Sequence, residues 1–440
     1  MLFSLAFPRP GWAVLAHVAL VPMTLLAAWS ARGKRVLWTS LLVAIFMWLY
    51  LLRWLWPVTG GGNIGLAVLM ASYTPAYLLV WRCIHKRFQL PAVLTVPLVY
   101  VTFEFIRGTF VAGGFGWFGL GHSQAPWHPD HGASKLIQVA SIGGEWAISF
   151  VVAMSSGVIV DLIMARTGKQ HAPSNTNVKR VAFSVGVWLI VFGGAMWYGQ
   201  QRIQDPFVIE GVDEFAGDTF LADGGMGVAI AVVQTNVPQS NKIRRNAEQL
   251  VKDFNRVMEL TLAVAQSDPK PSIILLPETV TPWPIDAFSV AEEYGKEYTG
   301  PLNSKTVHEA LMELAQATGC YLVLGSGRRA IVGEGKVKRW NAVFVYEPTG
   351  QRREQSYSKM HRVPFGEYIP WVEDVPWLKS LFFKYFSPYG EDNDYTLQAG
   401  EDRTVFEFNV PLVKAVPDGS PDQFTGPDGQ AAGTHRNLRV

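Results

Sequence analysis

A lysine and a glutamate, Lys359 and Glu367, lie on either side of a Val-Pro-Phe-Gly segment in the stretch Y-S-K-M-H-R-V-P-F-G-E-Y-I-P (residues 357–370). The prolines and the glycine restrict the backbone, so the stretch predicts a shaped loop and not a helix or strand. A lysine beside a carboxylate can stabilise an oxyanion next to a general acid or base. The two residues could also form an ordinary surface ion pair. The residues that precede the loop decide between these two interpretations.

A second candidate carboxylate, Glu278, follows an apolar segment. The segment S-I-I-L-L-P-E (residues 272–278) predicts a buried strand that ends at a Pro-Glu pair. Functional residues of α/β domains collect beyond the carboxyl ends of strands, which makes Glu278 a candidate general base. Its alternative role is that of a helix cap or turn residue. The following T-V-T-P-W-P, which contains Trp283, predicts a turn-forming loop that could wall a pocket.

The segments around these residues predict an α/β domain. A polar linker (residues 202–224) precedes a domain of residues 225–440, in which strand-like apolar runs alternate with amphipathic helices. The expected strands cover residues 226–234, 272–278, 320–326 and 341–346, and the expected helices cover residues 240–266, with Ser240 as N-cap, and 303–318.

Residues 1–201 are dominated by long uncharged apolar runs and predict a membrane domain. A membrane-spanning helix needs about 20 mostly apolar residues. Six spans are expected, at about residues 11–30, 37–56, 64–82, 89–106, 141–163 and 181–199. Buried helices of a soluble protein are the alternative interpretation, but so many uncharged runs in succession argue against it.

Basic residues in the short connections predict the orientation of these spans. Lysines and arginines follow the first span (residues 32–35) and the third span (residues 82–87), and others lie between the fifth and sixth (residues 166–180). Positive loops face the cytoplasm, so the N-terminus and everything after residue 200 are expected on the outer side. The N-terminal segment lacks a positively charged region before its apolar core and predicts no signal peptide. A further span upstream of Met1 would explain the outward N-terminus.

Polar residues near the outer ends of the spans are candidates for contact with lipid or substrate. Glu104 and Arg107 are three residues apart and can pair on one helix face. The next loop, G-G-F-G-W-F-G-L-G-H-S-Q, contains Trp117 and His122, and its aromatic residues are typical of a membrane interface. An acidic residue in a span, such as Glu145, is a functional candidate. Alternatively, Glu145 simply reaches water at the interface.

Composition argues against several other classes of protein. The net charge of +2 does not favour binding of nucleic acid. The two cysteines, Cys83 and Cys320, fall in different halves of the chain and predict neither a disulfide framework nor a zinc site. We therefore expect no metal and no cofactor.

These motifs together resemble the nitrilase, or carbon–nitrogen hydrolase, superfamily. The L-L-P-E segment at Glu278 and the K-M-H-R-V-P-F-G-E-Y-I-P segment at Lys359 and Glu367 match its catalytic motifs. Placed after a set of membrane spans, they resemble the apolipoprotein N-acyltransferase family, as do T-F-E-F-I-R-G, F-G-W-F-G-L-G-H-S-Q and V-V-Q-T-N-V-P-Q. The resemblance implies a polytopic α-helical membrane bundle followed by an α/β nitrilase-like domain, an α-β-β-α sandwich.

The resemblance also implies an activity. A cysteine would take a fatty acyl chain from a membrane phospholipid as a thioester and pass it to the α-amino group of a diacylglyceryl-modified apolipoprotein. In this role Glu278 would be the general base, Lys359 would stabilise the oxyanion, and Glu367 would orient the lysine or the acceptor. The implied location is the bacterial inner membrane, as a multi-pass protein with its catalytic domain on the periplasmic side.

One departure from the family pattern is large. The family's nucleophilic cysteine lies in an I-C-Y-E-like strand downstream of the lysine loop, whereas no cysteine follows Lys359 here. Cys320 is expected to be a buried structural thiol. The last residues, H-R-N-L-R-V, are expected to begin the missing strand. The nitrilase-like domain is therefore expected to be incomplete at its C-terminus, and the chain as it stands to be inactive.

Two other functions stay open from the sequence. A membrane-anchored C–N hydrolase or amidase would use water in place of the amine as acceptor. A pseudoenzyme would bind lipid or lipoprotein without turnover.

Overall fold

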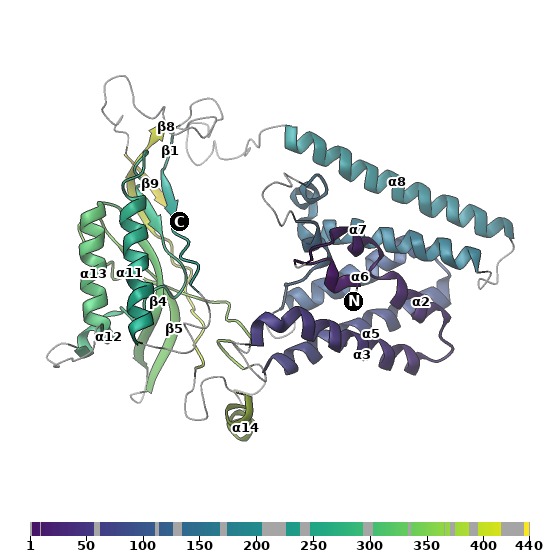
Figure 1. The fold of residues 1–440 in the computed structure, drawn as a ribbon, viewed down its shortest axis with the longest axis horizontal. Helices are drawn as coiled ribbons and strands as arrows, with labels where there is room; N and C mark the ends of the chain where they lie inside the picture. Colours follow the sequence, from purple (N-terminus) through teal and green to yellow (C-terminus); the bar gives the residue numbers. More distant parts are fainter. Residues whose placement is uncertain are drawn as a thin grey trace. The chain divides into compact units, whose positions relative to one another are not determined.

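The computed structural model describes residues 2–8, 10–56, 62–110, 114–125, 134–167, 174–204, 226–237, 247–293, 302–332, 336–364, 366–369, 375–386, 395–414 and 435–439. The chain divides into two compact units, Met1–Phe207 and Val208–Val440 (Figure 1). The first is built of apolar helices and the second contains β-sheet, so the predicted order of a helical membrane bundle and an α/β domain is confirmed. Most of the predicted linker, and Ser240, lie outside the described residues.

Five helices of the first unit are long and apolar enough to cross a membrane, counting only the described part of the chain. They indicate a membrane protein. The helices are α3 (Gly33–Leu51, continued by the 3₁₀ turn η2, Leu52–Leu55), α5 (Gly62–Phe88), α6 (Ala92–Thr109), α7 (Ala140–Arg166, preceded by η6, Leu136–Val139) and α8 (Ser174–Gln204).

The first predicted span is divided between two short elements. After α1 (Leu2–Leu5), the chain forms a 3₁₀ helix, η1 (Ala13–Val18), and then α2 (Val21–Trp29). Proline lacks an N–H and is tolerated in the first turn of a helix, so Pro22 marks the start of α2 and prevents one continuous helix. The division leaves α2 shorter than a spanning helix, and the six-span topology stays a prediction.

Helix α7 bends near its N-terminus at two glycines. Gly144 has φ of 62° and ψ of −163°, a conformation open to glycine and strained for other residues. The regular part of the helix therefore begins at about Glu145. Further along, Gly157 lets α7 approach α6 so closely that an added Cβ would lie 2.5 Å from the carbonyl oxygen of Ala92.

The second unit is organised around a five-stranded sheet with the order β2-β3-β4-β5-β6. Strands β2 (Ile230–Val232), β3 (Ile273–Leu275) and β4 (Tyr321–Val332) are parallel neighbours, and β5 (Lys336–Tyr346) and β6 (Tyr357–Ser358) continue the sheet in antiparallel fashion. The predicted strand 226–234 is interrupted, because Met226–Gly227 form a separate strand, β1, that pairs with β8 (Val413–Lys414).

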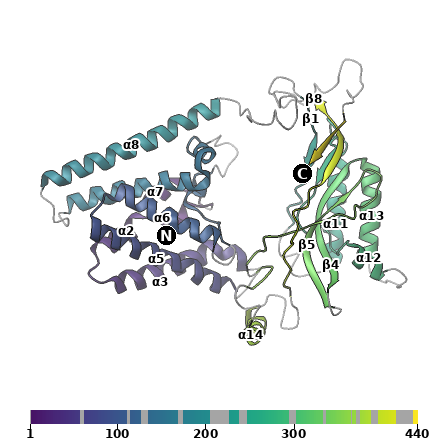
Figure 2. The same ribbon diagram turned by 180° about the vertical axis from the view of Figure 1, so that it is seen from behind.

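Three helices lie on one face of this sheet: α11 (Ala247–Val264), α12 (Ala287–Glu293) and α13 (Ser304–Thr318) (Figures 1 and 2). Helix α13 matches its prediction closely. The side chain of Asn303 caps it by accepting a 2.8 Å hydrogen bond from the Thr306 amide, and Gly319, with φ of 63°, ends it. Leu311 and Phe344 belong to the apolar core between helices and sheet.

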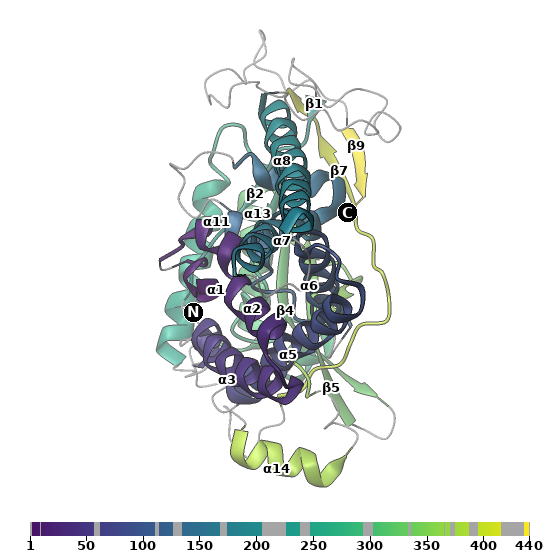
Figure 3. The ribbon, with the colours of Figure 1, turned by 90° about the vertical axis from the view of Figure 1, so that its right-hand side faces the viewer.

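The other face of the sheet is covered by β7 (Glu407–Pro411), which pairs with β9 (His435–Arg439) (Figure 3). Alternate residues of β7, Phe408 and Val410, are buried against Ile273 and Val345 of the sheet. A further helix, α14 (Pro376–Phe386), follows the lysine loop.

Candidate functional site

The three predicted catalytic residues of the α/β unit meet in one cluster. The Nζ atom of Lys359 lies 3.0 Å from Oε1 of Glu278 and 3.1 Å from Oε1 of Glu367. Glu278 is 81 residues away from Lys359 in sequence, so the fold itself creates the contact. The arrangement places one ammonium between two carboxylates at the edge of the sheet.

Glu278 is placed by the carboxyl end of β3. The chain leaves the strand through Pro277 and stays bonded to β4, since Gly325 N–H donates to Pro277 O at 3.2 Å and Val280 N–H donates to Gly325 O at 2.9 Å. A Cβ atom at position 325 would lie 2.6 Å from the Cα of Glu278. Only glycine lets β4 pass this close, so Gly325 helps to define where the carboxylate sits.

Lys359 is placed by the short strand β6, which it follows directly. The prediction of a loop was wrong for Tyr357 and Ser358, because these residues pair with β5. The Lys359 N–H donates to Asn341 O at 2.8 Å, and its carbonyl accepts from Gly400 N–H at 2.9 Å. The lysine backbone is therefore held on both sides, which leaves the side chain to reach the two carboxylates.

Asn341 is a residue of the site that the sequence analysis missed. Its side chain is 7% exposed, and its amide Nδ2 donates to Oε1 of Glu278 and, at 3.1 Å, to Oε1 of Glu367. One amide thus connects both carboxylates from the strand next to Lys359. The only signal in the sequence is a polar residue at the head of the apolar run N-A-V-F-V-Y, which by itself does not point to a site.

The two glutamates differ in how fully their oxygens are used. Glu367 is 13% exposed and uses both oxygens, because Oε2 accepts a 2.8 Å hydrogen bond from Val363 N–H. Glu278 is 59% exposed, and among the described residues only its Oε1 has a partner. Oε2 of Glu278 can therefore accept a proton from an incoming group, whereas Glu367 is suited to hold Lys359 in place.

The electrostatics keep Lys359 charged. Burial alone would lower the pKa of its ammonium, but the hydrogen bonds to Glu278 and Glu367, with the charges of both carboxylates, outweigh burial and raise the pKa above its ordinary value. A protonated ammonium at this position can neutralise an oxyanion that develops beside it.

Two further residues of this unit lie away from the cluster or at its border. Trp283 is half-buried in the turn after Glu278, and its role as a pocket wall stays a prediction. Cys320 is fully buried at the amino end of β4, the opposite edge of the sheet, and its Sγ donates to Pro271 O at 3.0 Å. Burial raises the pKa of this thiol, as expected of a structural cysteine.

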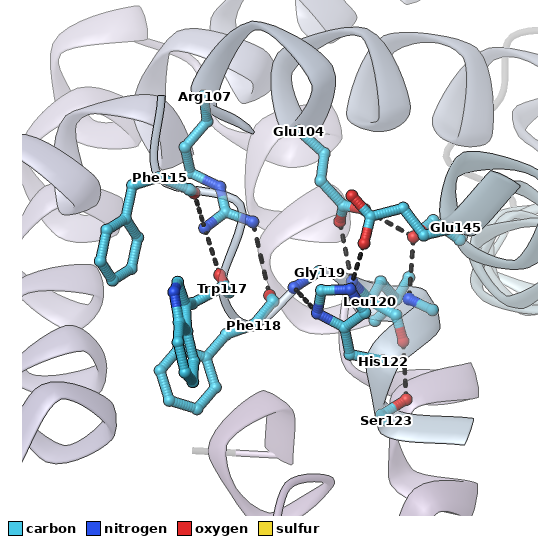
Figure 4. A network of polar contacts seen from close by, with 12 residues as sticks. Glu104, Arg107, Phe115, Trp117, Phe118, Gly119, Leu120, His122, Ser123 and Glu145 are labelled. Atoms are coloured by element: carbon cyan, nitrogen blue, oxygen red, sulfur yellow. Dashed lines mark hydrogen bonds and ion pairs between the residues drawn. The ribbon is translucent and has the colours of Figure 1, made fainter. Parts of the chain in front are cut away.

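The candidate residues of the helical unit form a second polar cluster (Figure 4). Glu104 is 3% exposed; its Oε2 accepts from Leu120 N–H at 2.9 Å and its Oε1 from Ser149 Oγ at 2.5 Å. Arg107, 5% exposed, donates to the carbonyls of Trp117 (2.7 Å), Phe115 (3.2 Å) and Phe118 (3.4 Å).

Glu104 and Arg107 therefore hold the loop after α6, and the hydrogen bonds between described residues do not join them to each other. The expected pairing of these two residues is replaced by contacts to loop backbone. Buried backbone groups require hydrogen-bond partners, and here two charged side chains supply them.

His122 and Glu145 do contact each other in this cluster, between Nε2 and Oε2, while Nδ1 of His122 accepts from Gly119 N–H at 3.2 Å. Trp117 is 59% exposed and packs against Trp54 with the ring centroids 5.3 Å apart. A cavity of about 80 Å³ lies beside Glu104 and Arg107 and is otherwise lined mostly by apolar and tyrosine side chains. The expectation that these residues face lipid or substrate stays a prediction.

Comparisons with known proteins find similarity over most of the chain. Residues 1–158 match the family described as the apolipoprotein N-acyltransferase N-terminal domain. An apolipoprotein N-acyltransferase from Geobacter metallireducens is 26% identical over 392 residues, covering 87% of this chain and 65% of that protein. One from Pseudomonas syringae pv. tomato is 25% identical, covering 76% and 54%. One from Haemophilus influenzae is 24% identical, covering 84% and 62%.

The chain thus spans 54 to 65% of the length of these curated relatives. Among solved structures, the crystal structure of an N-terminal amidase with a Gln-Val peptide is similar at 13% identity with a TM-score of 0.26, covering 49% of this chain and 38% of that one.

Proposed function

Since the chain is related to the apolipoprotein N-acyltransferases over most of its length, we propose that it transfers a fatty acyl chain to the N-terminal amine of apolipoproteins. The donor is a membrane phospholipid, and the acceptor is the diacylglyceryl-modified cysteine that begins the apolipoprotein. The observation that carries the proposal is the position of Lys359 between Glu278 and Glu367 at the edge of the sheet.

The first half-reaction forms a thioester. Glu278 takes the proton of a thiol through Oε2, which has no partner among the described residues, as the sulfur attacks the ester carbonyl of the phospholipid. The carbonyl oxygen becomes an oxyanion beside the Lys359 ammonium. The ester C–O bond then breaks, and the lysophospholipid leaves with the proton that Glu278 held.

The second half-reaction transfers the acyl chain. The amine of the apolipoprotein attacks the thioester carbonyl and gives a proton to Glu278, while Lys359 again faces the oxyanion. The C–S bond breaks, and the sulfur recovers the proton from Glu278. Glu367 and Asn341 keep the lysine and the base in place through both steps. No cofactor takes part in this scheme.

The nucleophilic thiol in this scheme is inferred from the family resemblance. Cys320 does not serve as this thiol, because it is buried at the opposite edge of the sheet. Determining the coding sequence beyond the codon for Val440 tests this part of the proposal. An in-frame strand with a cysteine supports the enzyme, whereas a stop codon supports a pseudoenzyme that binds lipid or lipoprotein.

The proposed location is the bacterial inner membrane, with the α/β unit on the periplasmic side. The distribution of lysines and arginines over the short connections supports this orientation. Both substrates are lipids, and the apolar helices of the same chain anchor the protein in the bilayer in which these lipids are dissolved.

The activity is tested with the protein expressed from its complete gene, a phospholipid donor and a diacylglyceryl lipopeptide acceptor. We expect N-acylated peptide as product, and we expect Glu278→Gln to abolish its formation. Glu309→Gln, an exposed carboxylate on α13, is the matched control and should leave the rate unchanged. Free fatty acid in place of acylated peptide would identify a hydrolase, and full activity of Glu278→Gln would refute the assigned base.

A further inference from the structure

The hairpin of β4 and β5 extends beyond the five-stranded sheet as a two-stranded ribbon. β3 pairs with β4 only as far as Val323, and β6 pairs with β5 only at Ala342 and Val343. β4 and β5 stay paired with each other out to Val332 and Lys336. Figure 1 shows their two long arrows side by side. We call residues 328–332 and 336–340 the distal ribbon.

The distal ribbon begins at the edge of the sheet that carries the candidate site. Gly325 of β4 lies against Glu278, three residues before the ribbon starts. On the returning strand, Trp340 is followed at once by Asn341, whose amide holds both carboxylates. The ribbon is therefore continuous with the two strands that hold the site.

Exposed aliphatic side chains gather at the tip of the ribbon. Residues opposite each other in the register share a face of the ribbon. Ile331 lies opposite Val337 on one face, with exposed fractions of 55% and 49%. Val332 is on the other face, opposite Lys336, and is 39% exposed. Among the described residues, each face of the tip thus presents an exposed aliphatic side chain.

The ribbon is also strongly basic. Its described residues include five cationic side chains and no acidic one: Arg328, Arg329, Lys336, Lys338 and Arg339. The connection between the strands adds one carboxylate, Glu334. Arg329 is neutralised by Glu292 at 2.8 Å. Lys336 and Lys338 take part in no ion pair within the described ranges, which leaves a positive charge around the aliphatic tip.

We propose that the distal ribbon docks on the surface of an anionic bilayer. Ile331, Val332 and Val337 enter the headgroup region, and the neighbouring lysines bind lipid phosphates. The protein is expected to reside in a bilayer, because its described residues include five helices able to cross one. A second copy of the ribbon fits this surface less well, since it presents the same positive charge. This docking is a property distinct from acyl transfer, and the proposal does not depend on whether the site turns over lipid.

The test measures how close the tip comes to lipid in the full protein, reconstituted in lipid nanodiscs. A fluorophore is attached at Ile331→Cys in a Cys83→Ser background, and nitroxide-labelled lipids serve as quenchers. The control label is at Ala317→Cys, an exposed position at the C-terminal end of α13 and so toward the opposite edge of the sheet. We expect stronger quenching at 331 than at 317, and more quenching in discs with phosphatidylglycerol than in discs of phosphatidylcholine alone.

Charge variants sharpen the test. Each of Lys336→Gln and Lys338→Gln should lower the docking equilibrium constant about fivefold, the effect of one basic residue near an anionic surface. Lys252→Gln, on the exposed face of α11, should not change it. Equal quenching at 331 and 317, or quenching indifferent to lipid charge, would overturn the proposal. The label at position 331 could also be shielded from the quenchers only in discs that hold two molecules. That result would overturn the proposal in favour of self-association. Because no reaction is measured, these outcomes are independent of the test of acyl transfer.

Discussion

The two clusters of charged residues in this protein differ in what their charges contact. In the helical unit, Glu104 and Arg107 are almost fully buried and direct their hydrogen bonds mainly at the backbone of one loop. In the α/β unit, Glu278, Lys359 and Glu367 contact one another, and Glu278 is 59% exposed. Charges that satisfy buried backbone define the shape of a loop. Charges that face each other and solvent retain capacity for a substrate.

This difference predicts that mutations in the two clusters have different consequences. Changes in the α/β cluster should lower the rate of reaction with little effect on folding. Changes in the helical cluster should lower stability first, and lower activity only through the loss of folded protein.

The largest effect is expected for Lys359→Met. The variant loses the ammonium that faces the oxyanion, and loss of one such donor costs about 10²–10³ in rate. The measurement is the initial rate of lipopeptide N-acylation by the protein from its complete gene. Lys305→Met, on the exposed side of α13, is the control. If the rate of Lys359→Met were within a few-fold of the wild-type rate, the Lys359 ammonium would not stabilise the oxyanion.

Arg107→Ala should destabilise the helical unit by about 2–3 kcal/mol, because it leaves carbonyls of the loop without their charged donor. Thermal unfolding in detergent measures the loss. Arg53→Ala is the matched control, since Arg53 is exposed and donates to one carbonyl, that of Tyr50. If Arg107→Ala kept its unfolding temperature yet lost activity, the helical cluster would be part of the reaction site and the contrast between the clusters would fail.

Asn341→Ala should lower the rate about tenfold, the value of one well-placed hydrogen bond to a charged group. The variant keeps both carboxylates and the lysine but removes the amide that connects the carboxylates. Steady-state kinetics should show the loss mainly in kcat, with an unfolding temperature close to that of the wild type. An unchanged kcat would mean that Lys359 and the Val363 amide are sufficient to position the two glutamates.

The smallest effect concerns pH and His308 of α13. Burial, aided by the charge of Arg352, lowers the pKa of this histidine from 6.5 to about 4, and its Nδ1 lies 2.7 Å from the Tyr346 hydroxyl. The unfolded chain therefore binds a proton between these pH values that the folded chain does not bind. The contribution of His308 to the free energy of unfolding is therefore fully present above pH 6.5 and decreases as the pH drops toward 4.

Allowing for solvent screening at this half-buried site, we expect a loss of about 1 kcal/mol for His308 between pH 7 and pH 5. His308→Gln should remove this part of the pH dependence, as measured by thermal unfolding at the two pH values. An equal loss in wild type and variant would assign the pH dependence to other groups.

Several parts of this protein were predictable because their causes are local. Apolar runs long enough to cross a membrane follow from composition alone. The Pro-Glu pair after a buried strand and the turn residues around Pro364 placed Glu278 and Lys359 correctly outside helices and strands. The break within the first predicted span also has a local cause, Pro22 in the first turn of α2. The prediction missed it because it was based on hydropathy, which does not report how a proline interrupts a helix.

Other parts depended on contacts between distant segments. The pairing of Glu104 with Arg107 followed from helix spacing, yet both residues bind the loop that folds back on them. Asn341 became part of the site because the register of β5 against β6 sets it opposite Lys359. No local pattern carries information of this kind.

The sequence by itself determined which groups are present: two carboxylates and a lysine on loops, an apolar first half, and an α/β second half. The tertiary structure decided which of these groups meet and which hold backbone instead. Glu278 and Lys359 are 81 residues apart, and strand order and register bring them within 3.0 Å. Strand pairing is a long-range choice that depends on the whole core, so it becomes visible only once the chain is folded.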